Sequence, residues 1–312
     1  MLLATSQHQP SEKTDGRDIF TRPFRRLTAE ALLQHFQTRP TVHYFPVPDV
    51  IETARLKIDH ILDNQFEFNG ERHRLPGSIQ WLTNPSNDRE WQILLHKFYY
   101  AVGLGMAYHE THAPHYAEKW VELTSSWIGT VPRDFLPSDV AGRRIQNWIF
   151  AHYYFVSNGQ PHCVTPEFYG SFLESLHHQL SYLRDHVTPV RNHRTLELCA
   201  IFLAAIVFPE FVESSEWLSW SKDELVKNIH SDLLPDGVHC EQSTDYHHLV
   251  LKNYLWIKKL ALLNQIEMPA EFDLLVKKAL EFSVYSHRPD GMIPALSDGD
   301  SRCFLDLLQQ GY

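Results

Sequence analysis

The chain has 312 residues, of which 43% are hydrophobic and 21% charged, as in an ordinary globular protein with one large core or two moderate ones. A net charge of −10 argues against a general nucleic-acid binder, which normally carries a basic domain or stripe. The longest apolar run, residues 198–208, is shorter than the roughly 20 residues that span a bilayer, and four scattered cysteines without a CxxC pair do not suggest a disulfide framework.

Residues 1–25 are polar and lack clear periodicity, so we expect an extended lead-in there. The basic and then apolar pattern of a signal peptide is not visible in this segment. The sequence therefore predicts a cytoplasmic protein, or a periplasmic or secreted one if the N-terminus was trimmed.

Most of the remaining chain repeats its apolar residues at helical spacing. A helix over 28–37 begins at the N-cap Thr28, and a second is predicted over 46–62. The segment 63–88 is polar and irregular, and the alternation in 66–75 predicts a short hairpin that turns at Asn69 and Gly70. Further helices are expected over 90–111, 114–132, 141–157, 165–187, 192–210, 214–233, 243–265 and 269–287.

Short loops make successive helices antiparallel neighbours, so helical hairpins should follow one another along the chain. Pro-Asp-Gly occurs at 235–237 and again 54 positions later at 289–291. The recurrence indicates either a repeated structural unit or simply a common turn. Residues 196–208 are apolar nearly all round, as expected for the inner helix of a double-layered toroid. The predicted fold is all-α, an incomplete (α/α) toroid over 26–312, although periodicity alone does not exclude an extended solenoid.

The first polar cluster is "RNHRT", residues 191–195, at the start of the apolar helix. Asn192 is a good N-cap residue, which is its plain structural interpretation. The same helix start, with Arg191, His193 and Arg194 beside it, would also make an anion site.

The second cluster is "DGVHCEQSTDYHHLVL", residues 236–251. The spacing of its histidines and cysteine does not favour a zinc site. His239 adjoins Cys240, His247 adjoins His248, and the one-turn spacing of helical metal ligands is missing. Ser243 or Thr244 can cap a helix that carries Tyr246 in its first turn. Such a tyrosine suits proton transfer, although a merely polar helix start would look similar.

Two weaker clusters follow from spacing. Arg144 and Trp148 lie one turn apart in "GRRIQNW", where they could grip an anionic sugar or simply form a cation–π pair. Trp81 and Asn84 lie in an irregular loop before a long helix, where substrate-positioning residues often occur.

Taken together, these segments resemble the heparinase II/III-like polysaccharide lyases. The Asn-His helix and the E-Q-S-x-x-Y-H segment are the most specific parts of this resemblance, which covers roughly residues 40–312. The matching pieces are "IQWLTNPSNDREW", "GRRIQNW", "NHRTLELCAIFLAAIVFPEF", "LLPDGVHCEQSTDYHHLVL" and "PDGMIPALSDGDS".

The resemblance implies a toroid that cleaves uronic-acid-containing polysaccharides, such as heparan sulfate or alginate, by β-elimination without a cofactor or metal. It places the carboxylate-neutralising role on Asn192 and the proton-transfer role on Tyr246, with His193 and His247 as further catalytic candidates. The predicted substrate-binding residues are Trp81, Asn84, Arg143, Arg144, Trp148, Arg194, Glu241 and Gln242.

Family members carry a C-terminal β-sandwich that supplies a second catalytic histidine, and we expect it to be absent from this chain. The acidic polysaccharide and that domain are the expected partners. Two alternatives stay open: a non-enzymatic toroid that binds a glycan or a protein, and a glycoside hydrolase with paired carboxylates. The available carboxylates are Asp236, Glu241, Asp298 and Asp300.

Overall fold

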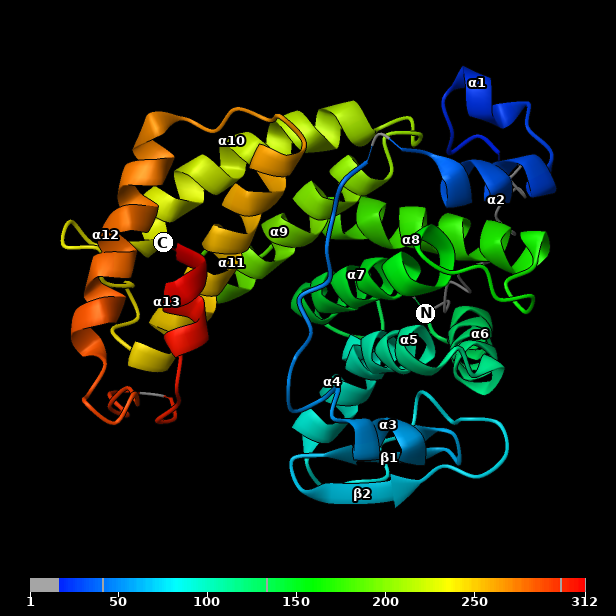
Figure 1. Cartoon of the computed structure of the whole chain (residues 1–312), viewed down its shortest axis with the longest axis horizontal. Coiled ribbons are helices and arrows are strands. Elements are labelled where there is room, and N and C mark those ends of the chain that lie inside the picture. Colours follow the sequence, from blue (N-terminus) through cyan, green and yellow to red (C-terminus); the bar gives the residue numbers. More distant parts are fainter. Residues whose placement is uncertain (1–16, 41, 133, 298, 312) are drawn as a thin grey trace, which may run out of the picture.

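The computed structural model describes residues 17–40, 42–132, 134–297 and 299–311, and it is predominantly helical (Figure 1). The all-α prediction is therefore confirmed. Of the predicted lead-in, residues 1–16 lie outside the described part, and Arg22–Arg25 form a short helix. The elements are α1 (Arg22–Arg25), α2 (Ala29–Thr38), α3 (Arg55–Ile61), β1 (Gln65–Phe68), β2 (Glu71–Arg74), α4 (Arg89–Lys97), α5 (Tyr99–Thr111), α6 (Pro114–Thr130), α7 (Ser138–His152), the π-helix η1 (Tyr153–Ser157), α8 (Pro166–Asp185), α9 (Arg191–Val207), α10 (Ser214–Asp232), α11 (Thr244–Leu263), α12 (Ala270–Ser286) and α13 (Leu305–Gly311).

The long helices form two layers. In one layer α5 packs against α7, α7 against α9, and α9 against α11. Each of these helices also packs against the helix that follows it, so that α6, α8, α10 and α12 make the second layer (Figure 1). Helix α9 is buried at every position from Thr195 to Val207, as its all-round apolar sequence predicts. Within the described part of the chain, no helix is both long and apolar enough to cross a membrane.

The predicted helix over 46–62 is wrong in its first half, because the helix begins only at Arg55. Asp49 instead closes a turn, accepting hydrogen bonds at Oδ1 from the backbone N–H groups of Ile51 and Glu52 at 3.0 Å each. Val50 and Ile51, which a helix over 46–62 would place on its apolar face, are 85% and 65% exposed. Pro48, which cannot donate a backbone hydrogen bond, directly precedes this turn.

The single helix predicted over 90–111 is broken at Phe98, whose φ of 60° is left-handed. The break separates α4 from α5, and helix α7 satisfies the freed carbonyl groups. Asn147 Nδ2 donates to the Lys97 carbonyl at 2.7 Å, and the Arg144 guanidinium donates to the His96 carbonyl at 3.3 Å. The Phe98 ring is fully buried, so packing holds the strained backbone in place.

The predicted turns are confirmed. Strands β1 and β2 pair with Phe68 opposite Glu71, and they turn through Asn69 and Gly70, both at positive φ. Both Pro-Asp-Gly segments close the same turn, in which Gly237 and Gly291 each donate a backbone hydrogen bond of 2.8 Å to the residue before the proline. The predicted helix over 141–157 differs in form: α7 begins at Ser138, and its last residues wind as the π-helix η1.

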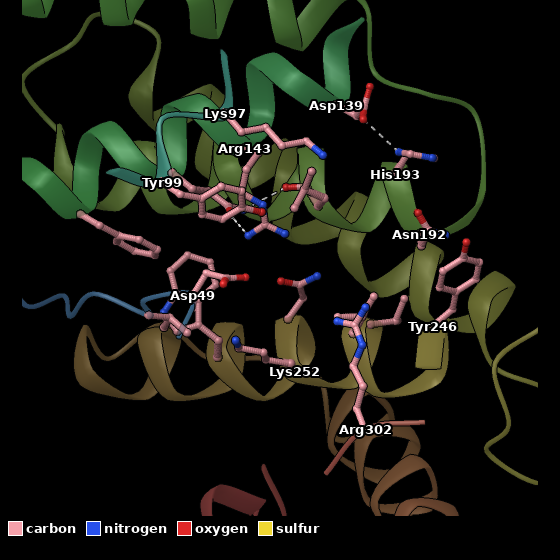
Figure 2. Close-up of a pocket in the computed structure, with 18 of the residues that line it drawn as sticks. Asp49, Lys97, Tyr99, Asp139, Arg143, Asn192, His193, Tyr246, Lys252 and Arg302 are labelled. Atoms are coloured by element: carbon pink, nitrogen blue, oxygen red, sulfur yellow. Dashed lines mark hydrogen bonds and ion pairs between the residues drawn. The ribbon is translucent and has the colours of Figure 1, made fainter. Parts of the chain in front are cut away.

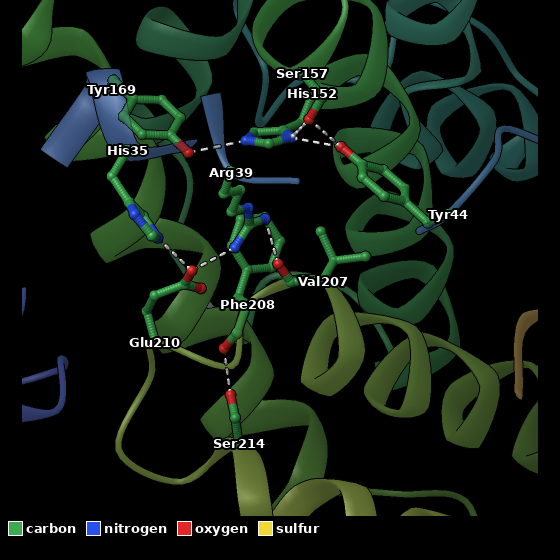
Figure 3. A network of polar contacts seen from close by, with 10 residues as sticks. All are labelled: His35, Arg39, Tyr44, His152, Ser157, Tyr169, Val207, Phe208, Glu210 and Ser214. Atoms are coloured by element: carbon green, nitrogen blue, oxygen red, sulfur yellow. Dashed lines mark hydrogen bonds and ion pairs between the residues drawn. The ribbon is translucent and has the colours of Figure 1, made fainter. Parts of the chain in front are cut away.

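A buried polar network ties α2 to the end of α9 (Figure 3). Arg39 pairs with Glu210 at 2.6 Å, and His35 contacts the same carboxylate at 2.7 Å. Nearby, His152 is hydrogen-bonded to the hydroxyls of Tyr44 at 2.7 Å and Tyr169 at 2.8 Å. Burial holds the pKa of His152 well below its usual value, so the ring is neutral and satisfies one tyrosine as donor and the other as acceptor.

Candidate active site

A cavity of about 480 Å³ lies among helices of the layer that contains α5, α7, α9 and α11 (Figure 2). Helices α4, α5, α7, α9 and α11 all contribute to its wall, together with the loop before α3 and the segment before α13. The lining residues are Val47, Asp49, Glu90, Lys97, Tyr99, Asp139, Arg143, Gln146, Phe150, Asn192, His193, Leu196, Tyr246, Leu249, Val250, Lys252, Asn253, Trp256 and Arg302.

Asn192 reaches this cavity from the first turn of α9. The helix begins at Arg191 with Val190 in the N-cap position, so the expectation that Asn192 caps the helix is wrong. Its Nδ2 group instead donates a hydrogen bond of 2.8 Å to Oε2 of Glu241. That contact uses one of the two amide hydrogens, so the Asn192 amide keeps a second donor.

Tyr246 reaches the same end of the cavity from the first turn of α11 (Figure 2). Of the two predicted cap residues, Ser243 is the N-cap of this helix, and its Oγ accepts a hydrogen bond of 3.2 Å from the Tyr246 backbone N–H. Tyr246 also lines a second cavity of about 390 Å³, whose other lining residues are Arg191, Cys240, Glu241 and Ser243.

His193 forms an ion pair with Asp139 of α7, with 3.2 Å between Nδ1 and Oδ2. The hydrogen bond to Asp139 raises the pKa of His193 above its usual value, against the opposing effect of burial. Burial by itself would raise the pKa of Asp139, but the hydrogen bond and charge of His193 outweigh it and lower that pKa. The pair therefore favours a protonated imidazole at the cavity wall.

Basic side chains outnumber acidic ones around the cavity. Lys97, Arg143, Lys252 and Arg302 face three carboxylates, whereas the whole chain carries 38 acidic and 28 basic residues. Burial, followed by the charge of Arg143, lowers the pKa of Lys252, as expected where cations are crowded together. A cavity of this kind attracts an anionic ligand although the molecule is acidic.

The structure corrects three predicted substrate contacts. Trp81 and Trp148 are fully buried, and Arg144 is 3% exposed, so none of them can touch a sugar in this arrangement. Trp81 Nε1 donates to Ser126 Oγ at 3.0 Å, and the Arg144 guanidinium lies 4.2 Å from the ring centroid of Trp127. Their roles are in the core, and the cation–π partner of Arg144 is Trp127 rather than Trp148, the partner expected from "GRRIQNW".

His247 is also buried rather than catalytic. Its Nε2 donates to the Ala279 carbonyl at 3.0 Å, and its Nδ1 accepts from the His239 backbone N–H at 3.3 Å. Burial, reinforced by the neighbouring His248, lowers its pKa to about 3. The ring thus joins α11 to α12 as a neutral structural group.

Three further predicted binding residues lie outside the lining of both cavities. Arg194 donates to the Thr188 carbonyl at 2.9 Å and pairs with Glu224 on α10. Asn84 Nδ2 donates to the Asp88 carbonyl at 2.9 Å beside the N-cap of α4, and Gln242 is an exposed residue at a positive φ of 53°. Of the predicted set, the cavities unite Arg143, Asn192, His193, Glu241 and Tyr246.

The carboxylates of the hydrolase alternative do not assemble in the described part of the chain. Asp236 is exposed and accepts the backbone N–H of Val238 within its own turn, and Asp300 is exposed beside Arg302. Asp298 lies outside the described residues. Glu241 is the one described member that lines a cavity.

Several lining residues were not predicted. Lys97 and Tyr99 flank the break at Phe98. The prediction of one uninterrupted helix did not include this break, so it could not place the two residues at the cavity. Arg302 follows the "SDGDS" loop directly, so the resemblance of that loop to the lyase family was a usable signal. Lys252 stands in an apolar helical stretch that shows no motif.

Comparison with known proteins shows the family to which the chain is similar. Residues 23–309 match the family model for the heparinase II/III N-terminus. A heparin-sulfate lyase of Bacteroides thetaiotaomicron is 24% identical over 308 residues, covering 88% of this chain and 43% of the relative. A heparin-sulfate lyase of Pedobacter heparinus is 28% identical over 233 residues, covering 70% of this chain and 34% of the relative.

Solved structures agree on the architecture. A crystal structure of heparinase III superposes with a TM-score of 0.76 at 24% identity, covering 84% of this chain and 43% of the other. A heparan sulfate lyase from Pedobacter heparinus superposes with a TM-score of 0.68 at 24% identity, covering 85% of this chain and 45% of the other. The predicted α/α toroid is confirmed, and the chain spans less than half the length of these relatives. The chain belongs to the heparinase II/III N-terminal family.

Proposed function

We propose that this chain is the helical domain of a polysaccharide lyase that cleaves heparan-sulfate-type chains by β-elimination at a uronic acid. One observation carries the proposal: Asn192 and Tyr246 line a single cavity whose wall is rich in basic side chains. The curated relatives named as heparin-sulfate lyases support the substrate class. Neutral and hydrophobic glycans are poorer candidates, because the basic side chains of the cavity favour an anionic ligand.

Elimination requires removal of the proton on C5 of the uronate, beside the carboxylate. Asn192 donates its second amide hydrogen to that carboxylate and stabilises the charge that develops there. The electron pair of the C5–H bond becomes the C4–C5 double bond, and the C4–O bond breaks. The Tyr246 hydroxyl takes the C5 proton or protonates the departing oxygen.

The basic wall holds the rest of the polymer. Arg143 lies over the Tyr99 ring at 5.9 Å and donates to Gln146 at 2.9 Å, so its guanidinium is positioned before a ligand arrives. Lys97, Lys252 and Arg302 provide further charges for carboxylates or sulfates. His193 adds a positive charge near Asn192 while Asp139 keeps it protonated.

The curated relatives extend over more than twice the matched length, which supports a further part of the proposal. We place the remaining catalytic histidine on a C-terminal β-sandwich, as the family resemblance implies. The toroid then supplies Asn192, Tyr246 and most of the binding surface.

The test is a lyase assay on the chain alone and on any longer form of the protein. Heparan sulfate, heparin, hyaluronan and alginate are each incubated with it, and the ultraviolet absorbance of a 4,5-unsaturated uronate is followed. Tyr246→Phe should abolish the signal, and Asn192→Ala should reduce the rate by roughly 10²-fold or more, since it removes a donor to the developing oxyanion. Tyr285→Phe is the matched control, because Tyr285 is 87% exposed and should not affect the rate.

Other outcomes point to other functions. New reducing ends without absorbance would show hydrolysis. Binding of heparan sulfate by every form of the protein, with no cleavage by any of them, would show a non-enzymatic module.

A further inference from the structure

The connection from α10 to α11 gathers three metal-binding side chains. Asp232 is the last residue of α10, and the chain then reverses so that Leu233 pairs with His239 and Cys240 N–H donates to the Asp232 carbonyl at 2.6 Å. As a result, one ligand atom from each of Asp232, His239 and Cys240 lies within 4.8 Å of the other two. Sequence spacing alone had argued against a metal here, because the third ligand comes from the preceding helix.

Two of these side chains present buried polar atoms that have no partner. Oδ1 of Asp232 and Nε2 of His239 lack a hydrogen bond in the described structure, although the two residues are 1% and 0% exposed. A buried polar atom without a hydrogen bond is unfavourable, so each of these two atoms is a candidate to coordinate an ion.

The other oxygen of the same carboxylate is firmly held. Oδ2 of Asp232 accepts hydrogen bonds from Thr195 at 2.6 Å, Tyr254 at 2.7 Å and Asn228 at 2.9 Å. Outer partners of this kind orient a carboxylate toward a metal ion and leave its second oxygen free to coordinate.

We propose that Asp232, His239 and Cys240 bind one divalent transition-metal ion of the zinc type. A set of one oxygen, one nitrogen and one sulfur atom suits Zn²⁺, whereas Mg²⁺ and Ca²⁺ prefer oxygen ligands alone. Bonds of about 2.0–2.3 Å in a tetrahedron hold ligand atoms roughly 3.3–3.8 Å apart, so the three side chains need only small adjustments to close on the ion.

The position of the site connects it to the cavity chemistry. Cys240 lines the second cavity beside Tyr246, which gives an ion a route from solvent. Glu241 follows Cys240 directly and accepts the hydrogen bond from Asn192 at 2.8 Å. An ion on His239 and Cys240 would therefore hold the segment that orients Asn192.

The experiment measures binding without substrate, so it is independent of the lyase assay. The full chain is stripped with a chelator and titrated with Zn²⁺ in a calorimeter, and Co²⁺ is used to detect the absorbance of a cobalt–thiolate bond. We expect one ion per chain and a thiolate band. Cys240→Ser should weaken binding by about 100-fold and remove the band, and His239→Gln should weaken it similarly.

Cys303→Ser is the matched control, because Cys303 is an exposed cysteine in another segment and its replacement should leave binding unchanged. Cys240→Ser is the deciding variant, since its side chain is not fully buried and its fold can be verified by circular dichroism. Binding of much less than one ion by the wild-type chain would overturn the proposal. Undiminished binding in the folded Cys240→Ser variant, or loss of the band in Cys303→Ser, would do so equally.

Discussion

The side-chain amide of Asn192 shows how one neighbour can orient a residue that we propose to be catalytic. An amide can present either its oxygen or its nitrogen to a ligand, and a uronate carboxylate needs the nitrogen. Glu241 accepts from Nδ2 at 2.8 Å, which selects the orientation in which the amide nitrogen faces the Glu241 carboxylate. Arg191 lies 3.7 Å from the other oxygen of Glu241 and offsets part of its charge.

His193 makes the charge of this site dependent on pH. Asp139 raises its folded-state pKa above the unfolded value of about 6.5. The pair therefore stabilises the protein fully below about pH 6.5 and loses this contribution as the pH rises through the folded pKa. Affinity for an anionic oligosaccharide should fall over the same interval.

The measurement is an NMR titration of the His193 ring in the wild-type chain and in Asp139→Asn. The substitution should move the pKa of His193 downward, because it removes both the charge and the ionic hydrogen bond. Glu216→Gln, which alters a carboxylate paired with Arg184 instead, should leave this titration unchanged. An unaltered His193 titration in Asp139→Asn would contradict the assigned cause.

At the scale of elements, local signals predicted the start of α11 and the burial of α9 but not the break at Phe98. The start of α11 follows from the Ser243 cap and the apolar run behind it, and the burial of α9 follows from its composition. The break at Phe98 does not, because the donor that satisfies the Lys97 carbonyl is Asn147, fifty residues later in the chain. Tertiary contacts of that kind leave no periodic trace in the sequence.

Spacing likewise could not separate a binding residue from a core residue. Arg143 and Arg144 are adjacent, yet Arg143 lines the cavity while Arg144 is buried against Trp127. Arg144 also donates to Gln179 at 2.7 Å, so it belongs to the packing between α7 and α8. One residue of helical rotation separates the two roles, and only the packed structure defines that rotation.

The turn between α10 and α11 gives a prediction about stability. Gly237 has a φ of +88°, and a Cβ built on it would lie 2.6 Å from the backbone of Lys278 in α12. Gly237→Ala should therefore combine left-handed backbone strain with a clash that only a backbone shift can relieve. We expect a loss in unfolding free energy of about 2–4 kcal/mol, measured by urea denaturation.

Gly77→Ala is the matched control. Gly77 has a similar φ of +72°, but a Cβ there would meet nothing within 4 Å. Its substitution should cost about 1 kcal/mol, the strain alone. Equal losses in the two variants would show that the contact with α12 contributes nothing.

Across the whole molecule, charge is separated between the surface and the cavity. Ten more acidic than basic residues keep the chain negative, while the cavity collects Lys97, Arg143, Lys252 and Arg302. Low-dielectric walls concentrate the field of these cations, so an anionic chain is attracted to the cavity rather than to the surface at large. Total composition argues against a general nucleic-acid binder, but it could not reveal this local reversal of charge.

Lys252 tests that reversal with a control on its own helix. Lys252→Met should weaken binding of a sulfated oligosaccharide by about 10-fold, because a charged contact is lost, and the salt dependence of binding should become shallower. Lys258→Met, also on α11, removes a lysine that pairs with Asp273 at 2.9 Å and does not line the cavity. Its Kd should stay near the wild-type value at every salt concentration. If the two variants weaken binding equally, net charge governs the affinity; a loss confined to Lys252→Met locates the binding in the cavity.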